Sequence, residues 1–301
     1  MNAPVLTIPA LLAREMPAIA DLRDPVRDHA LESCIASLDL LAKTVIDLRG
    51  GVGVNAMRFA KYGAMRVFTL ILDPQAVRYA RQLIRSNGFE GVITVISKPV
   101  AQAQVDGDLP EGADILFADA LDCGVFNEGG LELFDDIAAL RGPMTRVLPE
   151  AVFQSGVMVH DPASRATCRF DTSCGFDLSC LNRMNGRGYV PVVNESAAQQ
   201  LSPRVLCRRY DFTSRDCLED RIIDVVATRD GPCDGLLTWF EAHYGQVLLC
   251  NRREGSLWPP AYHPLETPIP VRAGQRYRFQ MTGDGRVGFL CDSAAPERVT
   301  A

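Results

Sequence analysis

The chain has 301 residues, of which 47% are hydrophobic, and its formal net charge is −6 with a pI near 5.3. This length predicts two domains, and a mean hydropathy near zero is typical of a globular protein rather than a disordered one. The acidic balance argues against a dedicated nucleic-acid binder, and no apolar run approaches the length of a membrane-spanning helix.

The ten cysteines are spread along the chain without C-x-x-C pairs. Zinc sites and disulfide scaffolds usually show such clustering, so we predict neither of them and no other metal site. Residues 1–20 lack the charged start and the long apolar core of a signal peptide. We therefore expect reduced cysteines and a cytoplasmic protein.

The first predicted element is a helix that begins after Asp24. Asp24-Pro25 combines a capping carboxylate with a proline at the first helical position, and apolar residues follow at helical spacing as far as Ile35. Arg27 lies in the first turn, where a cation opposes the helix dipole. Two interpretations remain open for Arg27: a solvated surface arginine, or a cation that binds a ligand carboxylate.

The stretch from Thr44 to Gly53 predicts a strand, a tight turn and a helix. Three β-branched residues lead through Asp47 into a turn that contains Gly51 and Gly53. Glycine suits such a turn because the backbone approaches a ligand closely and adopts positive φ. The spacing departs from the G-x-G-x-x-G fingerprint of NAD-binding proteins. It fits better the loop of methyltransferases that bind S-adenosylmethionine, and a strand-to-helix turn without a ligand is the alternative.

Further strands are predicted at 67–71, 92–96 and 114–117, with a helix over 75–86. Strands that alternate with helices imply a mostly parallel sheet whose ligands bind at the carboxyl ends of the strands. Asp73 follows the first of these strands. It either caps the helix that comes next or hydrogen-bonds ribose hydroxyls.

Two acids lie beyond the strand at 114–117, and they mark the predicted active-site loop. These acids are Asp119 and Glu128, within the segment 118–128. Their position after a parallel strand is the reason for this prediction.

From about residue 150 the character of the chain changes to an all-β pattern. Turn signals separate short β-type runs at 152–159, 205–212, 222–228, 236–240, 246–250 and 277–281. The segment from 175 to about 201 interrupts this pattern and is predicted to be an insertion or a projecting arm, with a long surface loop as the alternative. The pair Arg208-Arg209 is expected on a solvated face.

Taken together, these stretches resemble the protein arginine methyltransferases over nearly the whole chain from about residue 22. The segment Asp24-x-x-Arg27 is similar to the D-x-x-R motif of that family, and 47–53 is similar to its glycine loop. Asp119 and Glu128 fall where the family has a two-glutamate loop.

The resemblance continues in the second half of the chain. Residues 175–180 are similar to the start of the family's dimerisation arm, and Ser256-Leu257-Trp258 lies where a Thr-His-Trp loop is expected. Asp122, with Glu128 and Gly129, resembles the branch that only monomethylates, called type III.

The resemblance implies an α/β fold: a Rossmann-like, mostly parallel methyltransferase domain over 1–150, then a β-barrel domain over 151–301 with an inserted arm. It implies methyl transfer from S-adenosylmethionine to a guanidinium of a protein arginine or of a small guanidino compound. It also implies a homodimer or a heterodimer formed through the arm. The resemblance implies that Asp119 and Glu128 are catalytic and that Asp122 and Trp258 belong to the substrate loop. The residues that it implies for cofactor binding are Arg27, Asp47, Gly51, Gly53 and Asp73.

The chain departs from the family pattern at several positions around the cofactor. Arg49 replaces a loop glycine, Ile71 stands in place of a ribose-binding glutamate, and Ala101 replaces an acid that contacts the adenine. Leu257 replaces the histidine expected to pair with Asp24. These departures favour a second hypothesis, in which the chain is a catalytically impaired member that acts as a scaffold or as a regulatory dimer partner.

Overall fold

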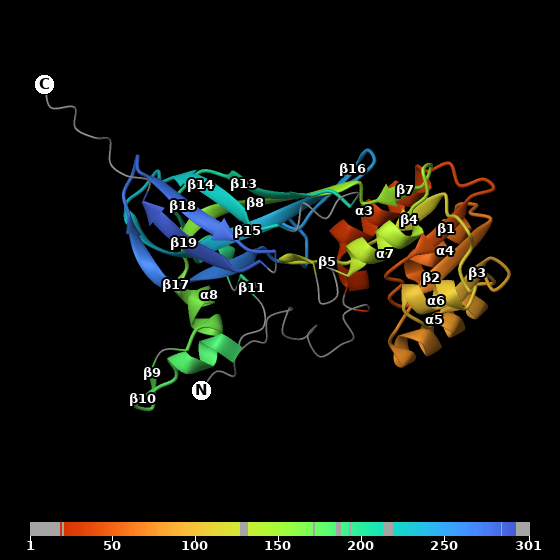
Figure 1. Ribbon diagram of the computed structural model, residues 1–301, viewed down its shortest axis with the longest axis horizontal. Coiled ribbons are helices and arrows are strands. Elements are labelled where there is room, and N and C mark those ends of the chain that lie inside the picture. The colour runs from red at the N-terminus through yellow and green to blue at the C-terminus, as the bar shows by residue number, and fades with distance from the viewer. Residues whose placement is uncertain are drawn as a thin grey trace, which may run out of the picture.

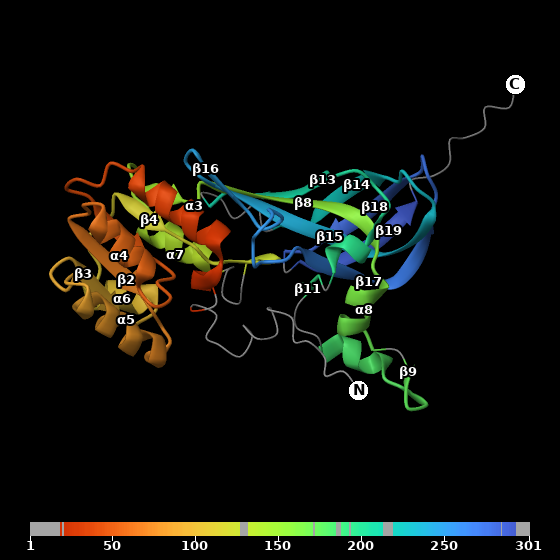
Figure 2. The same ribbon diagram turned by 180° about the vertical axis from the view of Figure 1, so that it is seen from behind.

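The computed structural model describes Ile19 and residues 21–126, 132–170, 172–184, 188–192, 194–212, 219–283 and 285–292. Figures 1 and 2 show two parts side by side, with an α/β unit at one end of the molecule and antiparallel sheets at the other. The predicted fold class is confirmed.

The α/β part is built on a five-stranded sheet in which every neighbouring pair of strands is parallel. Its strand order is β3-β2-β1-β4-β7. The strands are β1 (Thr44–Asp47), β2 (Arg66–Leu70), β3 (Ile93–Ile96), β4 (Ile115–Phe117) and β7 (Arg146–Leu148). The first four lie where the sequence predicts them. The sequence does not predict β7, because three residues offer too short an apolar run.

The helices of this part confirm the two predicted from capping signals. They are α3 (Pro25–Ala36), α4 (Val54–Lys61), α5 (Pro74–Ser86), α6 (Val100–Val105) and α7 (Leu133–Leu140), with a short 3-10 turn η1 (Asp21–Arg23) before α3. Asp24 caps α3 through the amides of Val26 and Arg27. Asp73 caps α5, accepting from the Ala76 amide at 2.7 Å. The capping interpretation of Asp73 is therefore confirmed.

The glycine turn between β1 and α4 needs its glycines for two reasons. Gly51 and Gly53 adopt φ values of 54° and 85°, a region that residues with a Cβ atom rarely occupy. Gly50 packs against β2, and its amide donates to the Leu70 carbonyl at 3.0 Å. A Cβ atom on Gly50 would overlap the Thr69 hydroxyl. The turn thus lies directly against the neighbouring strand.

The second part consists of two antiparallel sheets. The larger follows the order β11-β17-β15-β8-β12, with β13 paired to β8 and β16 paired to β15, and the smaller follows β14-β18-β19. The strands are β8 (Ala151–His160), β11 (Val190–Pro191), β12 (Gln199–Gln200), β13 (Val205–Tyr210), β14 (Arg221–Val226), β15 (Gly231–Tyr244), β16 (Val247–Cys250), β17 (Ala261–Val271), β18 (Arg276–Met281) and β19 (Val287–Asp292). Apolar side chains from both sheets, such as Met158, Leu236 and Phe279, form one core.

Two features of this part differ from the sequence expectations. The sequence does not predict β17, because Pro264, Pro268 and Pro270 argue against a central strand. Among the described residues, β11 pairs with β17 only at Ala261 and Tyr262. The prolines follow this stretch, so on that side of β17 they need no backbone N–H to donate to β11. Arg208 is 2% exposed and donates to the carbonyls of Met281 and Thr282. The expectation of a solvated face is therefore wrong for Arg208.

A segment projects from the larger sheet in both views (Figures 1 and 2). It comprises α8 (Pro162–Cys168), the hairpin of β9 (Thr172–Ser173) and β10 (Phe176–Asp177), and the 3-10 helix η2 (Ser179–Met184). Within the predicted arm over 175–201, β11 and β12 instead belong to the larger sheet. Among the projecting residues, Phe170 and Phe176 expose 49% and 69% of their surface.

An apolar cluster joins the α/β part to the larger sheet. Phe117 at the end of β4 contacts Tyr244 of β15, with ring centroids 6.1 Å apart. Phe134 of α7 stacks on Phe212 at 5.2 Å. These contacts fix the junction between the two parts, and the buried residues around them form a single cluster. No helix in the described ranges is long and apolar enough to cross a membrane.

We predict that Gly50→Ala lowers the free energy of unfolding by about 1–3 kcal/mol, because the added methyl overpacks the contact with β2. The new Cβ atom would overlap Thr69 Oγ1 and lie 3.0 Å from Ile71 Cγ1. Urea denaturation measures the change. The matched control is Gly91→Ala, where no atom lies within 4 Å of the added methyl. Equal stability of the two variants would contradict the prediction.

Candidate functional site

The first component of the site is the turn at the start of α3, which a loop of the β part holds in place. Asp24 is 1% exposed, and its Oδ2 accepts from the Ser256 hydroxyl at 3.0 Å and from the Leu257 amide at 2.8 Å. Both oxygens of this buried carboxylate are therefore satisfied, as burial requires. Asp24 therefore keeps two hydrogen bonds from this loop even though leucine replaces histidine at position 257.

Arg27 and Asp119 form a buried ion pair at the junction of the two parts. Arg27 is 7% exposed and Asp119 is 6% exposed, so the solvated interpretation of Arg27 is wrong. The Arg27 guanidinium also lies 4.7 Å from the centre of the Trp258 ring. Such a cation–π contact is favourable when desolvated. Three predicted site residues are thus brought together.

Tyr244 completes this group, and the sequence does not predict its role. Its hydroxyl donates to Asp119 Oδ1 at 3.1 Å. Burial, together with the charge of Asp119, raises the pKa of Tyr244 well above its ordinary value, so the phenol keeps its proton. The only available signal is general: a buried tyrosine usually finds a hydrogen-bond partner. The sequence alone does not identify Asp119 as that partner, because 125 residues separate Tyr244 from Asp119.

Asp47 ends β1 beside the glycine turn and is completely buried. Its Oδ2 accepts from the Thr69 hydroxyl at 3.0 Å, while its buried Oδ1 has no hydrogen-bond partner among the described residues. Burial raises the pKa of Asp47 to about 7, and the nearby Asp119 charge adds to the effect. A buried acceptor next to a glycine turn fits a polar ligand such as the ribose and amino-acid parts of S-adenosylmethionine.

The residues at and near the departures from the family pattern lie in different environments and do not gather into a group of acids. Ile71 is buried among apolar neighbours, Asp73 is exposed and caps α5, and Ala101 is exposed on α6. Arg49 donates to the Leu48 carbonyl at 3.0 Å and pairs with Asp136 of α7 at 3.1 Å. Glu128 lies outside the described residues, which also show no grouping of three or more metal-ligating side chains.

The predicted substrate-loop residue Asp122 lies in a small hairpin, β5 (Leu121–Asp122) and β6 (Val125–Phe126). Its carboxylate accepts from the Tyr189 hydroxyl and from the Gly124 amide. The partner Tyr189 comes from the β part, next to β11. Asp122 therefore joins the loop after Asp119 to the second part of the chain.

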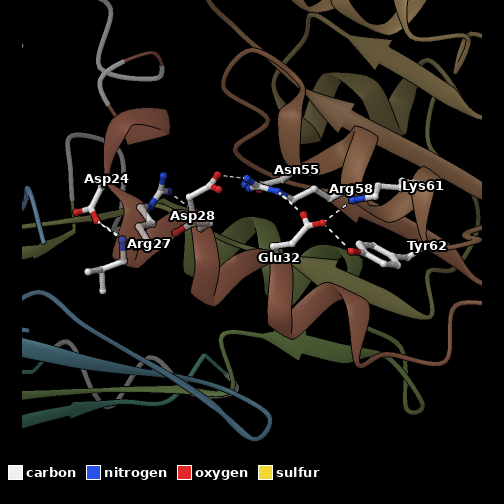
Figure 3. Close-up of polar contacts among 10 residues, drawn as sticks. Asp24, Arg27, Asp28, Glu32, Asn55, Arg58, Lys61 and Tyr62 are labelled. Atoms are coloured by element: carbon white, nitrogen blue, oxygen red, sulfur yellow. Dashed lines mark hydrogen bonds and ion pairs between the residues drawn. The ribbon is translucent and has the colours of Figure 1, made fainter. Parts of the chain in front are cut away.

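Figure 3 shows the polar network that fastens α3 to α4. Arg58 of α4 pairs with Asp28 and Glu32 of α3, and its Nε lies 3.0 Å from Glu32 Oε2. The other oxygen of Glu32 accepts from the Tyr62 hydroxyl at 2.6 Å. Because α4 begins at the glycine turn, these contacts fix Arg27, on α3, relative to that turn.

Comparisons with known proteins agree with this geometry. A family profile described as ribosomal protein L11 methyltransferase (PrmA) matches residues 29–139. An arginine N(omega)-methyltransferase from Streptomyces achromogenes subsp. streptozoticus is 32% identical over 272 residues, which cover 87% of this chain and 74% of that protein. The histone-arginine methyltransferase CARMER of Drosophila ananassae is 23% identical over 275 residues, 84% of this chain and 51% of the relative. The chain thus spans about half the length of CARMER.

Solved structures share the fold. A structure described as a Trypanosoma brucei PRMT1 enzyme–prozyme heterotetrameric complex with AdoHcy has a TM-score of 0.72 at 22% identity, covering 87% of this chain and 86% of that one. Protein arginine methyltransferase 10 of Arabidopsis thaliana has a TM-score of 0.68 at 16% identity, covering 87% and 86%.

The chain belongs to the arginine N-methyltransferase family. The predicted methyltransferase function is confirmed, and the scaffold alternative is not favoured. The family implies S-adenosylmethionine as the cofactor. The orphaned acceptor of Asp47 and the glycine turn fit this group, whereas the position of Ile71 offers no acid to its ribose.

Asp47 generates a prediction on pH. The unfolded chain releases this proton near pH 3.8 and the folded chain only near pH 7. Asp47 therefore lowers the free energy of unfolding as the pH rises from 4 to above 7, by roughly 4 kcal/mol in total. Asp47→Asn removes this loss, so its stability falls less steeply over that range in denaturation at a series of pH values.

The control for this experiment is Asp106→Asn. Lys98 lowers the pKa of Asp106, so that group titrates below pH 3.8 and leaves the range from 4 to 7 unchanged. An identical pH slope for Asp47→Asn and the unaltered protein would show that burial does not raise the pKa of Asp47, and it would contradict the prediction.

Proposed function

We propose that this chain transfers the methyl group of S-adenosylmethionine to a guanidinium nitrogen of arginine, with Asp119 and Glu128 as the acids that hold the acceptor. The observation that carries this proposal is the burial of Asp119 between Arg27 and Tyr244, where the two parts of the chain meet. The family supplies the reaction type, and this acid supplies a group suited to a guanidinium.

The cofactor's own contribution is an electrophilic methyl group on a sulfonium. The residues of this chain that we assign to holding it are Arg27, whose charge suits the cofactor carboxylate, and the turn containing Gly51 and Gly53. Asp47 offers its buried oxygen as a further acceptor. Asp73 is the acid nearest in sequence to the ribose-binding position, and it already caps α5. We infer a relaxed cofactor site in which the ribose is held by fewer acids than the family usually provides.

The acceptor guanidinium is always protonated and presents a planar fork of donors. Asp119 already accepts from Arg27 and Tyr244, yet a carboxylate has about four lone-pair positions, so it can accept again. Carboxylates bind the fork bidentately and orient one nitrogen towards the methyl group, so positioning supplies much of the catalysis. As the new N–C bond forms, the sulfonium would lose its methyl group and leave as a neutral thioether. A carboxylate is the natural acceptor of the proton that the nitrogen gives up.

Several guanidino compounds are candidate acceptors. One relative is named for arginine itself and another for histone arginine, so both free and protein-bound arginine are candidates, as is a small guanidino compound. The higher identity of the first relative favours free arginine. The resemblance of Asp122 to the type III branch supports monomethylation as the product.

We also propose that the projecting segment forms a homodimer or a heterodimer. Phe170 and Phe176 on this segment expose large apolar surfaces, as interface residues do. The related Trypanosoma brucei structure is a heterotetrameric complex, which agrees with assembly in this family.

We also propose a cytoplasmic location. The described cysteine side chains carry free thiols. The division at residue 150 into two domains is proposed on the change from the parallel to the antiparallel sheet.

The direct test is transfer of a labelled methyl group to free arginine and, separately, to an arginine-containing peptide. We expect transfer to free arginine, with monomethylarginine as the product. Asp119→Asn should lower kcat/KM by about 100-fold or more, since it removes the charge that pairs with the guanidinium. Glu128→Gln should have a similar effect.

The control is Asp106→Asn, which alters an exposed acid that pairs with Lys98. It should retain full activity. Transfer to the peptide alone would replace free arginine by protein arginine as the acceptor. No transfer to any guanidino compound would overturn the proposed function.

A further inference from the structure

The hairpin that follows Asp119 is held from the β part of the chain. Its turn, Cys123 and Gly124, connects β5 to β6. Asn251 of the β part donates to the Cys123 carbonyl at 3.5 Å and to the Pro259 carbonyl at 3.0 Å. A second contact comes from Tyr189, which immediately precedes β11.

Tyr189 reaches the hairpin through its hydroxyl and through its ring. The hydroxyl lies 3.0 Å from Asp122 Oδ1 and 2.8 Å from Oδ2, and the Gly124 amide donates to the same carboxylate at 2.7 Å. A Cβ atom at Gly124 would overlap the Tyr189 ring. A phenol bonded to a carboxylate is a charge-assisted hydrogen bond, roughly twice as strong as a neutral one.

Tyr189 is itself fixed in one orientation. It is 8% exposed, and its ring centroid lies 5.5 Å from that of His263. The His263 ring is fully buried and is bonded on both nitrogens, to Gly285 O at 2.6 Å and to Thr238 Oγ1 at 2.8 Å. Burial lowers the pKa of His263 to about 4, so this support is uncharged and constant near neutral pH.

We propose that Tyr189 is a positioning residue for the acceptor site: by holding Asp122, it sets the path of the chain that follows Asp119. This inference rests on the proposed function. It gives Asp122 an internal role, because its carboxylate anchors the hairpin instead of contacting the acceptor. The acid loop is thereby linked to the residue that precedes β11 of the larger sheet.

The test is a double-mutant cycle on the full chain with Tyr189→Phe and Asp122→Asn. We expect each change to raise the KM for arginine about tenfold, because each removes the same charge-assisted hydrogen bond. The double variant should be no worse than either single one. The dissociation constant of S-adenosylhomocysteine, measured by calorimetry, should stay within about twofold in every variant.

The matched control is Tyr277→Phe, which removes a buried hydroxyl that donates to Gln275 in the smaller sheet. It should lower the melting temperature without changing the KM for arginine. An unchanged KM in Tyr189→Phe, or effects of the two changes that multiply in the double variant, would overturn the positioning role alone. Absence of methyl transfer by the unaltered protein would overturn the proposed function, and the positioning role with it.

Discussion

The buried ion pair between Arg27 and Asp119 is the contact on which the rest of the site depends. Removing two charges from water is costly unless geometry and further hydrogen bonds repay it. Here the compensating contacts come from the other part of the chain: Tyr244 donates to Asp119, and the Trp258 ring lies against Arg27. The pair is therefore stable only where the parallel sheet and the antiparallel sheets meet.

This constraint explains why the loop around Trp258 contacts α3 at all. Asp24 begins the helix that carries Arg27, and it takes two of its hydrogen bonds from Ser256 and Leu257. One of these donors is a backbone amide, which every residue except proline provides. A change of side chain at Leu257 therefore leaves this contact in place, and the start of α3 remains tied to the β part.

The sequence predicts the α/β part well, since its signals are local. Alternating strands and helices, the glycine turn and the caps at Asp24 and Asp73 all depend on residues within a few positions of one another. Asp119 is predicted for a similar reason, because it follows a parallel strand. By contrast, the prolines of β17 argue against a strand, and only the pairing of β17 with its neighbours shows where proline is tolerated. Arg208 is buried because its guanidinium donates to the Met281 carbonyl, far away in the sequence.

The partners of the site residues could not be predicted, because they depend on long-range packing. Nothing near Tyr244 in the chain indicates Asp119, and nothing near Tyr189 indicates Asp122. Arg49 illustrates the same limit. Its sequence position suggests a bulky cation in the glycine turn, whereas its guanidinium binds Asp136 on α7 and the Leu48 carbonyl.

We propose that Arg27 and the glycine turn hold S-adenosylmethionine although Ile71 offers no acid to its ribose. The decisive experiment is titration calorimetry of the unaltered protein with S-adenosylhomocysteine. We expect binding in the micromolar range, about −8 kcal/mol, and binding at least tenfold weaker in Arg27→Met. Absence of binding by the unaltered protein, with recovery in an Arg49→Gly, Ile71→Glu, Ala101→Glu variant, would contradict this assignment.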